Sequence, residues 1–224
     1  MKKIVNIAID GPSGAGKSTL ARAVAKKLGI TYIDTGALYR AIGLYMLRAG
    51  IEPGDAASVV PALSGVKLTM SPGSEQRVFL SDEDVTPYIR TDEVSRAASS
   101  VSAIPEVRTF LLSLQRDIAK VQSVVMDGRD IGTVILPDAD VKIFLTASAE
   151  KRAERRWKEL TERGEKVTYE EILSSQRQRD ERDSTRKTAP AVPADDAVLF
   201  DNSSLNAEET VERAVGIIEE RLKK

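Results

Sequence analysis

Short apolar runs alternate along the chain with longer stretches in which apolar residues recur every three or four positions. Five runs have the length and continuous apolar character of buried parallel strands, and they span residues 4–9, 31–34, 124–127, 141–145 and 198–201. Helical spacing appears over residues 20–28, 37–47, 105–120, 149–162, 168–183 and 207–222. Strands that alternate with helices predict an α/β fold, in which helices cover both faces of a five-stranded parallel sheet.

Several of the predicted helices have signals at their ends. Gly29 follows the first helical stretch and is well placed to cap its C-terminus. Thr168 with Glu171 forms a capping-box pattern, and Asn206 with Glu209 forms a similar start signal. These signals support the boundaries that the apolar spacing predicts.

One segment departs from the alternation. Residues 66–70 and 77–80 have the pattern of two hairpin strands, joined through residues 71–74. With the flanking stretch to about Arg96, they predict a small β-rich insertion in the α/β fold. A second irregular stretch, residues 163–166, lies between two charged helices, and we expect it to form a mobile turn.

The composition limits the chemistry and the location of the protein. Hydrophobic residues make up 42% of the 224 residues, enough for a sizeable core. The formal net charge of -1 gives no general attraction to nucleic acid or to an anionic membrane. No stretch approaches the roughly 18 apolar residues of a membrane span. We therefore expect neither a signal peptide nor a membrane span, and a cytoplasmic location.

Two residue types are absent from the sequence. Without cysteine the chain has no disulfide, thiol nucleophile or cysteine zinc site. Without histidine it has no imidazole acid–base chemistry and no Ser-His-Asp triad. The remaining carboxylates, cationic side chains, hydroxyls and backbone amides suit phosphate chemistry.

A glycine-rich loop follows the first predicted strand. It matches the pattern G-x-x-x-x-G-K-[ST], and the residues that we expect to bind ATP are Gly11, Pro12, Ser13, Gly14, Ala15, Gly16, Lys17, Ser18 and Thr19. Glycines let successive N–H groups point at the phosphates, and the following helix presents its positive end. Lys17 reaches the β- and γ-phosphates, and the Ser18 hydroxyl binds Mg²⁺.

A bound triphosphate does not by itself define the reaction, because P-loop proteins include switches, motors and small-molecule kinases. A GTPase switch would need an aspartate with glycine three residues later and an Asn-Lys-x-Asp motif. No aspartate has glycine at that spacing, and no asparagine is followed by lysine. The sequence therefore disfavours a GTPase.

Arginines and carboxylates occur where a kinase of a small phosphorylated acceptor would need them. Such an enzyme brings two polyanions together, so fixed cations must surround both. Arg40 lies shortly after one strand end. Asp127, Arg129 and Asp130 follow the end of another buried strand, where open parallel sheets bind ligands. An ordinary polar turn is the alternative for residues 127–130, and we favour the functional interpretation.

Two helices each have charged residues at helical spacing. These are Arg179, Arg182, Asp183 and Arg186 in one helix and Arg152, Arg155 and Arg156 in the helix before it. On spacing alone, a solvated face is the more common explanation of such a charge run. Their position on either side of the Gly164 turn also fits a flap that closes over the transferring phosphate.

Together these motifs resemble those of the bacterial cytidylate (CMP) kinases. The resemblance rests on the phosphate loop, on Asp34-Thr35-Gly36-Ala37-Leu38-Tyr39-Arg40, on Asp127-Gly128-Arg129-Asp130-Ile131-Gly132-Thr133 and on residues 179–186. It runs in order over nearly the whole chain and is far more specific than the phosphate loop alone. The β-rich insertion is similar to the enlarged monophosphate-binding region that distinguishes these enzymes from adenylate kinases. Thr35 stands where serine is common in the family, and it keeps the hydroxyl.

The resemblance implies transfer of the γ-phosphate of ATP to CMP or dCMP, with Mg²⁺, in pyrimidine nucleotide metabolism. It implies catalytic roles for Lys17, Arg129 and Arg179, Mg²⁺ binding by Ser18, and an ATP-side position for Arg155. The residues implied on the monophosphate side are Thr35, Arg40, Ser99, Arg108, Asp127, Arg129, Asp130, Asp183 and Arg186. Of these, Arg40, Arg129 and Arg186 would bind the acceptor phosphate, Ser99, Arg108 and Asp130 would read cytosine, and Asp183 would bind the ribose.

We therefore expect a P-loop NTPase fold in three parts. A core with the five-stranded sheet comprises residues 1–35, 101–151 and 181–224, a monophosphate-binding region comprises 36–100, and a short helical lid comprises 152–180. The nearest alternative is a kinase of another small acceptor such as UMP or shikimate. The alternative from another class is a nucleotide-binding regulator with slow hydrolysis. We expect small-molecule substrates, no nucleic-acid or membrane partner, and a monomer.

Overall fold

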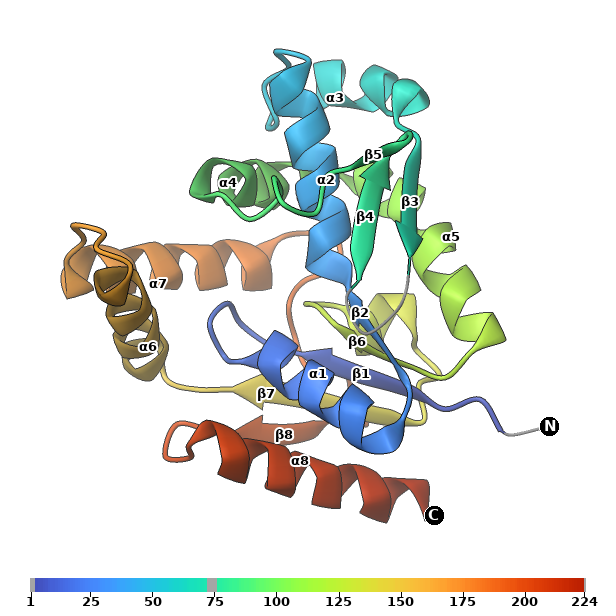
Figure 1. The fold of residues 1–224 in the computed structure, drawn as a ribbon, viewed down its shortest axis with the longest axis vertical. Coiled ribbons are helices and arrows are strands. Elements are labelled where there is room, and N and C mark those ends of the chain that lie inside the picture. The colour runs from blue at the N-terminus through green and yellow to red at the C-terminus, as the bar shows by residue number, and fades with distance from the viewer. Residues whose placement is uncertain (1–2, 72–75, 224) are drawn as a thin grey trace. The chain divides into compact units, whose positions relative to one another are not determined.

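The computed structural model describes residues 3–71 and 76–223, and Figure 1 shows how their helices and strands are connected. One parallel sheet has the strand order β2-β6-β1-β7-β8. Its strands are β1 (Asn6–Asp10), β2 (Thr31–Asp34), β6 (Val124–Asp127), β7 (Val141–Thr146) and β8 (Val198–Asp201). The predicted five-stranded parallel sheet and α/β fold are confirmed.

The chain forms two compact units. Unit 1 consists mainly of Ile30–Val124, and unit 2 consists of Val5–Gly29 and the chain from Val125 onward. No described helix combines the length and the apolar character that crossing a membrane requires.

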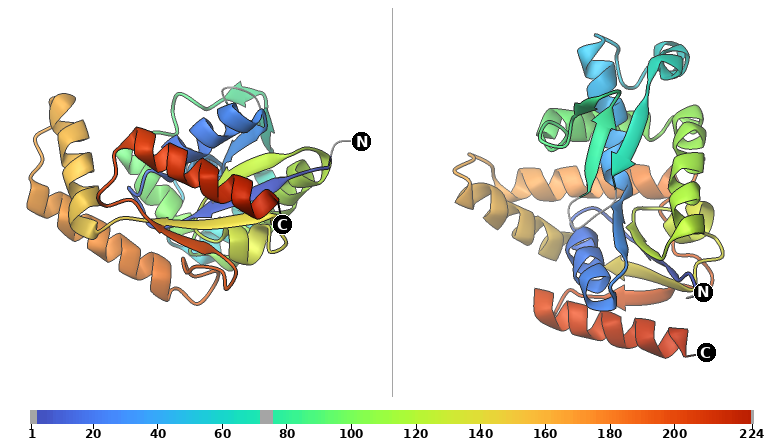
Figure 2. Two further views of the ribbon diagram at one scale, coloured as in Figure 1. Left: turned by 90° about the horizontal axis from the view of Figure 1, so that it is seen from below. Right: turned by 45° about the vertical axis from the view of Figure 1, so that its right-hand side comes forward.

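Unit 2 is organised around strands β1 and β7. Ile7 lies opposite Val141, and Asp10 lies opposite Phe144, so the two strands end together. Ile7 and Ile9 are almost completely buried, as the continuous apolar run predicts for a strand covered on both faces. Helices α1 (Lys17–Leu28) and α8 (Ala207–Leu222) lie side by side, and α8 packs against β7 (Figure 2).

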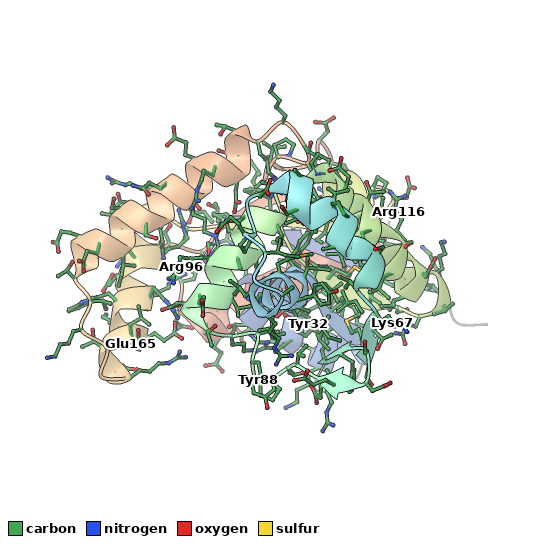
Figure 3. All side chains as sticks on the ribbon, turned by 90° about the horizontal axis from the view of Figure 1, so that it is seen from above. Tyr32, Lys67, Tyr88, Arg96, Arg116 and Glu165 are labelled. Atoms are coloured by element: carbon green, nitrogen blue, oxygen red, sulfur yellow. The ribbon has the colours of Figure 1, made fainter. Side chains whose placement is uncertain are left out.

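Helices α6 (Ala149–Glu162) and α7 (Tyr169–Thr185) in unit 2 are joined by a short turn and pack against each other at an angle (Figure 1). Their small apolar contact contains Ala153, Leu160 and Ile172. Glu165 lies in the connecting turn (Figure 3), and its N–H donates to the Leu160 carbonyl at 3.0 Å. Gly164, with a φ of 79°, adopts the left-handed conformation that this helix end requires.

The predicted helix-end signals are confirmed. Thr168 and Glu171 form a capping box at α7, and Asn206 and Glu209 form another at α8. Gly29 caps α1 in the left-handed region and donates to the Ala25 carbonyl.

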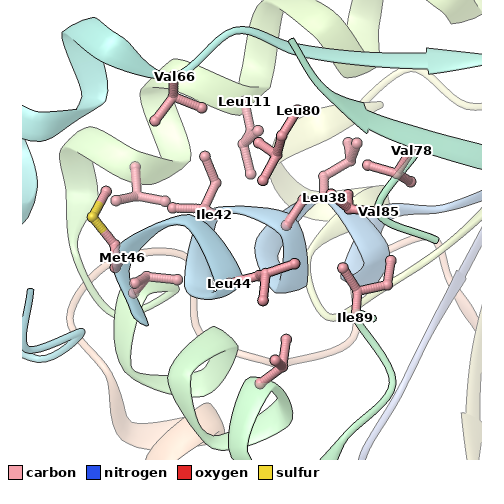
Figure 4. Close-up of a cluster of buried hydrophobic side chains, with 14 of the residues drawn as sticks. Leu38, Ile42, Leu44, Met46, Val66, Val78, Leu80, Val85, Ile89 and Leu111 are labelled. Carbon is pink, nitrogen blue, oxygen red and sulfur yellow. The ribbon is translucent and has the colours of Figure 1, made fainter. Parts of the chain in front are cut away.

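Unit 1 is built around helix α2 (Thr35–Arg48). The helix packs against α4 (Asp92–Val101) and against strand β4 (Arg77–Leu80) of a small antiparallel sheet, which also contains β3 (Leu68–Ser71) and β5 (Glu83–Asp84). The other helices of the unit are α3 (Ala56–Ala62), the short η1 (Leu63–Gly65) and α5 (Pro105–Val121). Leu38, Ile42 and Met46 on α2 belong to one buried cluster with Leu80 and Leu111 (Figure 4).

The predicted hairpin strands of unit 1 are present, with β3 beginning two residues later than expected and β5 adding a third strand. The predicted hairpin turn falls on residues 72–74, which lie outside the described residues. Helices α3 and α4 were not predicted. Between α2 and α4 the backbones approach closely, because a β-carbon added at Gly43 would lie only 2.9 Å from Ala98 N.

Candidate active site

The phosphate loop connects β1 to α1 in unit 2, and glycines determine its shape. Gly11 has a φ of 145°, and a β-carbon there would lie 1.9 Å from the Leu145 carbonyl oxygen. Gly14 and Gly16 have φ angles of 77° and 91°. Residues with a β-carbon rarely adopt these conformations, so the three glycines permit the curled backbone that phosphate binding needs.

Three side chains donate hydrogen bonds to carbonyl groups of this loop. Lys17 Nζ donates to the Pro12 carbonyl at 2.7 Å. Arg152 Nη1 donates to the Ser13 carbonyl at 2.9 Å, and Asn202 Nδ2 donates to the Ala15 carbonyl at 3.1 Å. These bonds hold the loop in its curled form.

Lys17 is almost fully buried at the start of α1. Burial lowers the pKa of its ammonium group well below the ordinary value, Arg129 and Arg179 lower it further, and Asp127 and Asp10 oppose the shift. A group placed among cations in this way gains from an added anion, because the negative charge offsets both burial and repulsion.

Ser18, the next residue of α1, contacts the end of β6. Its hydroxyl donates to Asp127 Oδ2 at 2.8 Å. A hydroxyl and a carboxylate therefore lie together beside the phosphate loop, and both are oxygen ligands of the kind that Mg²⁺ prefers.

Asp10 is a buried carboxylate that the sequence analysis did not single out. Its two oxygens accept the N–H groups of Ile131 at 2.8 Å and Gly132 at 2.7 Å, at the start of the short helix η2 (Ile131–Ile135). Burial raises its pKa to about 6, even though the two backbone hydrogen bonds act in the opposite direction. The only sequence signal was its position at the strand end directly before Gly11.

Four of the predicted monophosphate-binding residues come together in unit 2. Arg129 Nε donates to Asp183 Oδ2 at 3.0 Å, linking the end of β6 to the C-terminal part of α7. Arg186 lies 3.9 Å from Asp183 Oδ1 and 3.9 Å from Asp130 Oδ1. Burial alone would raise the pKa of Asp183, but Arg129, Arg179 and Arg186 hold it below its ordinary value. The cluster is therefore a dense, largely buried array of fixed charges.

The charged helix faces are partly buried and partly exposed to solvent. Arg152 is buried, and besides the phosphate loop it binds Asp180 Oδ2 at 2.6 Å. Arg182 is exposed, as on a solvated face, and Arg156 pairs with Glu159 along its own helix.

Arg155 lies beside a cavity of about 340 Å³ in unit 2. Its Nη2 donates to the backbone carbonyl of Asn202 at 2.9 Å, and its Nη1 lies 3.4 Å from Asn202 Oδ1. The cavity begins at the phosphate loop and has both polar and apolar walls, lined by Gly16, Thr19, Leu20, Arg155, Asn202, Leu205, Asn206, Ala207, Thr210 and Val211. It has the size and the apolar surface that a flat base needs.

The other predicted residues belong to unit 1. Arg40 Nη1 lies 3.7 Å from Asp34 Oδ1, near the buried Thr35 at the N-terminus of α2. Asp34 also pairs with Arg90 at 3.4 Å, a cation that the sequence analysis did not identify.

Ser99 and Arg108 lie on neighbouring helices of unit 1, α4 and α5. Arg108 is largely buried, donates to the Ser102 carbonyl at 3.1 Å and lies over the Tyr39 ring at 5.4 Å. Ser102, at the end of α4, in turn donates its hydroxyl to the Ser99 carbonyl at 2.9 Å.

The fold and the loop define the class of the protein. A buried parallel strand, a loop curled by three glycines and a helix that starts at the loop lysine are the phosphate-binding unit of P-loop α/β proteins. A solved structure of shikimate kinase from Bacteroides thetaiotaomicron aligns with a TM-score of 0.50 and 16% identity, over 97% of this chain and 99% of that chain. At that identity the likeness shows the fold alone.

Sequence comparison identifies the family. The cytidylate kinase family model matches residues 7–220. A protein named cytidylate kinase from Carboxydothermus hydrogenoformans is 49% identical over 215 residues, which cover 96% of this chain and 97% of the relative. Another, from Caldanaerobacter subterraneus subsp. tengcongensis, is 51% identical over 219 residues, covering 98% and 96%. The chain belongs to the cytidylate kinase family, and the resemblance seen in the motifs is confirmed.

Proposed function

We propose that this protein transfers the γ-phosphate of ATP to CMP or dCMP, giving ADP and CDP or dCDP. The observation that supports this most directly is the family match over residues 7–220, which includes the phosphate loop, the Asp127–Asp130 stretch and the arginines of α7. The enzyme is an ATP-dependent phosphotransferase with a phosphate group as acceptor.

ATP binds in unit 2. Its phosphates lie in the loop from Gly11 to Thr19, and its base lies in the cavity beside Arg155. Lys17 supplies a buried positive charge for the β- and γ-phosphates, and the lowered pKa of its ammonium group rises again when phosphate oxygens approach.

The residues beside the loop fit Mg²⁺. The Ser18 hydroxyl and the Asp127 carboxylate lie 2.8 Å apart, and both are hard oxygen ligands of the kind that Mg²⁺ prefers. When bound, Mg²⁺ neutralises charge on the phosphate oxygens of ATP. Ser18 and Asp127 would hold it.

The acceptor phosphate is already anionic, so attack on the γ-phosphate needs no general base. Lys17, Arg129 and Arg179 stabilise the charge that spreads over the oxygens of the transferred group. Arg40, Arg129 and Arg186 bind the acceptor phosphate.

The monophosphate is recognised through its base, its ribose and its phosphate. Ser99, Arg108 and Asp130 read cytosine, because its amino group donates to a carboxylate while its N3 and O2 accept from a guanidinium. Asp183 binds the ribose, and Thr35 adds a hydroxyl. The working parts are a core of residues 1–35, 101–151 and 181–224, a monophosphate-binding region of 36–100 and a lid of 152–180.

An assay of ADP release with ATP and CMP, dCMP, UMP, AMP or shikimate tests this proposal. We expect the highest kcat/KM with CMP or dCMP. A higher value with UMP or shikimate would contradict the acceptor assignment. ATP turnover that responds to no acceptor would favour a nucleotide-binding regulator. Lys17→Ala, which removes the cation of the loop, excludes a contaminating kinase if it abolishes the activity.

The proposal extends to partners and location. Both substrates are small, charged nucleotides, so we infer a cytoplasmic enzyme that works as a monomer without nucleic-acid or membrane partners. Light scattering coupled to gel filtration, with and without ATP and CMP, tests the monomer. A stable dimer in both conditions would contradict it.

A further inference from the structure

Asn202 connects three segments of unit 2 through one nearly buried side chain. It directly follows β8, and its backbone N–H donates to the Thr146 carbonyl at 2.9 Å, so its main chain is fixed against the end of β7. Only 4% of the residue is exposed. Asn202 belongs neither to the phosphate-loop motif nor to the arginine-bearing helices α6 and α7.

The carboxamide of Asn202 binds both the phosphate loop and Arg155. Its Nδ2 donates to the carbonyl of Ala15, a residue with no exposed surface. On its other side, Arg155 Nη1 lies 3.4 Å from Oδ1, and Arg155 Nη2 donates to the Asn202 backbone carbonyl at 2.9 Å. Both groups of the carboxamide are therefore used, one by the loop and the other by the arginine.

The contact with Ala15 matters because of how a phosphate loop works. Its N–H groups point inward at the phosphates, so its carbonyl groups turn outward and need donors of their own. Lys17 and Arg152 serve the carbonyls of Pro12 and Ser13. Asn202 serves the Ala15 carbonyl, next to Gly16, whose left-handed φ of 91° leads into α1.

We propose that Asn202 is a positioning residue of the donor site: it holds the Ala15–Gly16 peptide of the phosphate loop and the guanidinium of Arg155 in the orientation that receives ATP. The proposal rests on the ATP site proposed above. Asn202 also lines the cavity beside Arg155, so it acts on the phosphate side and the base side of the same ligand.

Two substitutions separate the two contacts of Asn202. Asn202→Ala removes both side-chain contacts and leaves only the bond from Arg155 Nη2 to the backbone carbonyl. Asn202→Asp keeps an oxygen for Arg155 but places a second oxygen against the Ala15 carbonyl, where a donor is needed. Ser204→Ala is the matched control, because Ser204 is exposed in the same connection between β8 and α8.

Calorimetric titration of the full chain with MgATP, without an acceptor, measures the effect. We expect Kd for MgATP to rise about 10-fold or more in both Asn202 variants, because the free loop can then turn its Ala15 carbonyl towards water and must give up that relaxed form when ATP binds. The Ser204→Ala variant should bind like the wild type. In steady-state assays, KM for CMP should stay close to the wild-type value in all three variants.

Two outcomes would overturn the proposal. One is an unchanged Kd for MgATP in both Asn202 variants. The other is an equal loss of affinity for ATP and CMP with a matching fall in unfolding free energy, because that pattern indicates a general structural role. The titration contains no acceptor, so its result is independent of which monophosphate the enzyme phosphorylates.

Discussion

Replacing Asp10 by asparagine tests how a buried charge fixes the active-site backbone. The carboxylate accepts two N–H groups at 2.8 and 2.7 Å, directly after the Asp127–Asp130 stretch. Asparagine has the same shape, but its amide nitrogen would face one of those N–H groups and cannot accept from it. The substitution therefore removes the charge and one hydrogen bond while filling the same space.

The magnitude follows from the raised pKa. Burial moves the pKa of Asp10 from its ordinary value of 3.8 to about 6, and the charges of Asp130 and Lys17 act on it in opposite directions. A raised pKa means that the folded state disfavours the ionised form. Asp10 thus favours folding most below about pH 3.8, and this contribution is lost as the pH rises to 6. The increase in pKa from 3.8 to about 6 corresponds to about 3 kcal/mol of unfolding free energy.

The assay is urea unfolding of the wild type, Asp10→Asn and the control Asp138→Asn between pH 4 and pH 8. Asp138 is exposed, so its variant should follow the wild type. The unfolding free energy of the wild type minus that of Asp10→Asn should fall by about 2 to 3 kcal/mol as the pH rises across this range. At neutral pH the relieved charge offsets much of the lost hydrogen bond, so the two proteins should differ little in stability there.

The activity of Asp10→Asn should nevertheless fall. The backbone after Asp130 loses one of its two anchors, so kcat/KM for CMP should drop about 10-fold at neutral pH. A difference in unfolding free energy that is constant with pH would refute the reasoning about burial. A difference that increases with pH would show that the two hydrogen bonds outweigh burial and that the pKa is lowered.

Three further predictions concern other parts of the fold and site. Arg129→Ala should lower kcat by about 10³-fold in a folded protein, because it removes the positive charge that stabilises the transferred phosphoryl group. Near-normal turnover would exclude this role of Arg129. Ser18→Ala should raise the Mg²⁺ concentration for half-maximal rate about 10-fold, and an unchanged magnesium titration would contradict Ser18 as a ligand. Gly43→Ala should destabilise the protein by about 1–3 kcal/mol by forcing α2 and α4 apart. The control Gly216→Ala, in a helix with open space around it, should stabilise the protein slightly.

The apolar periodicity sufficed for the core elements, because each is determined locally. Strands β2, β6 and β8 and helices α6 and α8 have the bounds that the pattern predicts. Capping residues within three positions of each helix start fixed the ends of α7 and α8. Residues close to one another in the sequence determine these elements, so their bounds can be predicted from a single sequence.

Helix α4 was missed although its signals were present. Thr91 accepts from Val94 N, acidic residues occupy the first turn, and the buried positions Val94, Ala97, Ala98 and Val101 follow helical spacing. Two of these four positions are alanines, so the apolar face of α4 is only weakly hydrophobic. The sequence pattern of the preceding hairpin therefore led to the prediction of a β-rich insertion up to about Arg96. The small size of the alanines has a physical reason, since α2 and α4 pack closely at Gly43.

Asp10 and Asn202 could not be found from local patterns. Asp10 binds residues 121 and 122 positions away, and Asn202 binds Ala15 across 187 positions. Neither contact has a sequence signature, because any polar residue at a strand end fits the pattern equally well. The motif identified the loop, but the residues that hold its shape become visible only when the strand ends are brought together.

The contacts of Asp10 and Asn202 also explain how the phosphate loop stays curled although charged groups are buried beside it. Burial lowers the pKa of Lys17 and raises the pKa of Asp10, so the charged form of each is disfavoured in the free protein at neutral pH. The backbone bonds of Asp10 and the three side chains on the loop carbonyls resist relaxation of that arrangement. A bound triphosphate adds negative charge beside Lys17, so part of this electrostatic cost is removed by the ligand itself. The electrostatic cost of burying Lys17 therefore contributes to the affinity for ATP. The surrounding hydrogen bonds keep the loop folded in the free protein despite that cost.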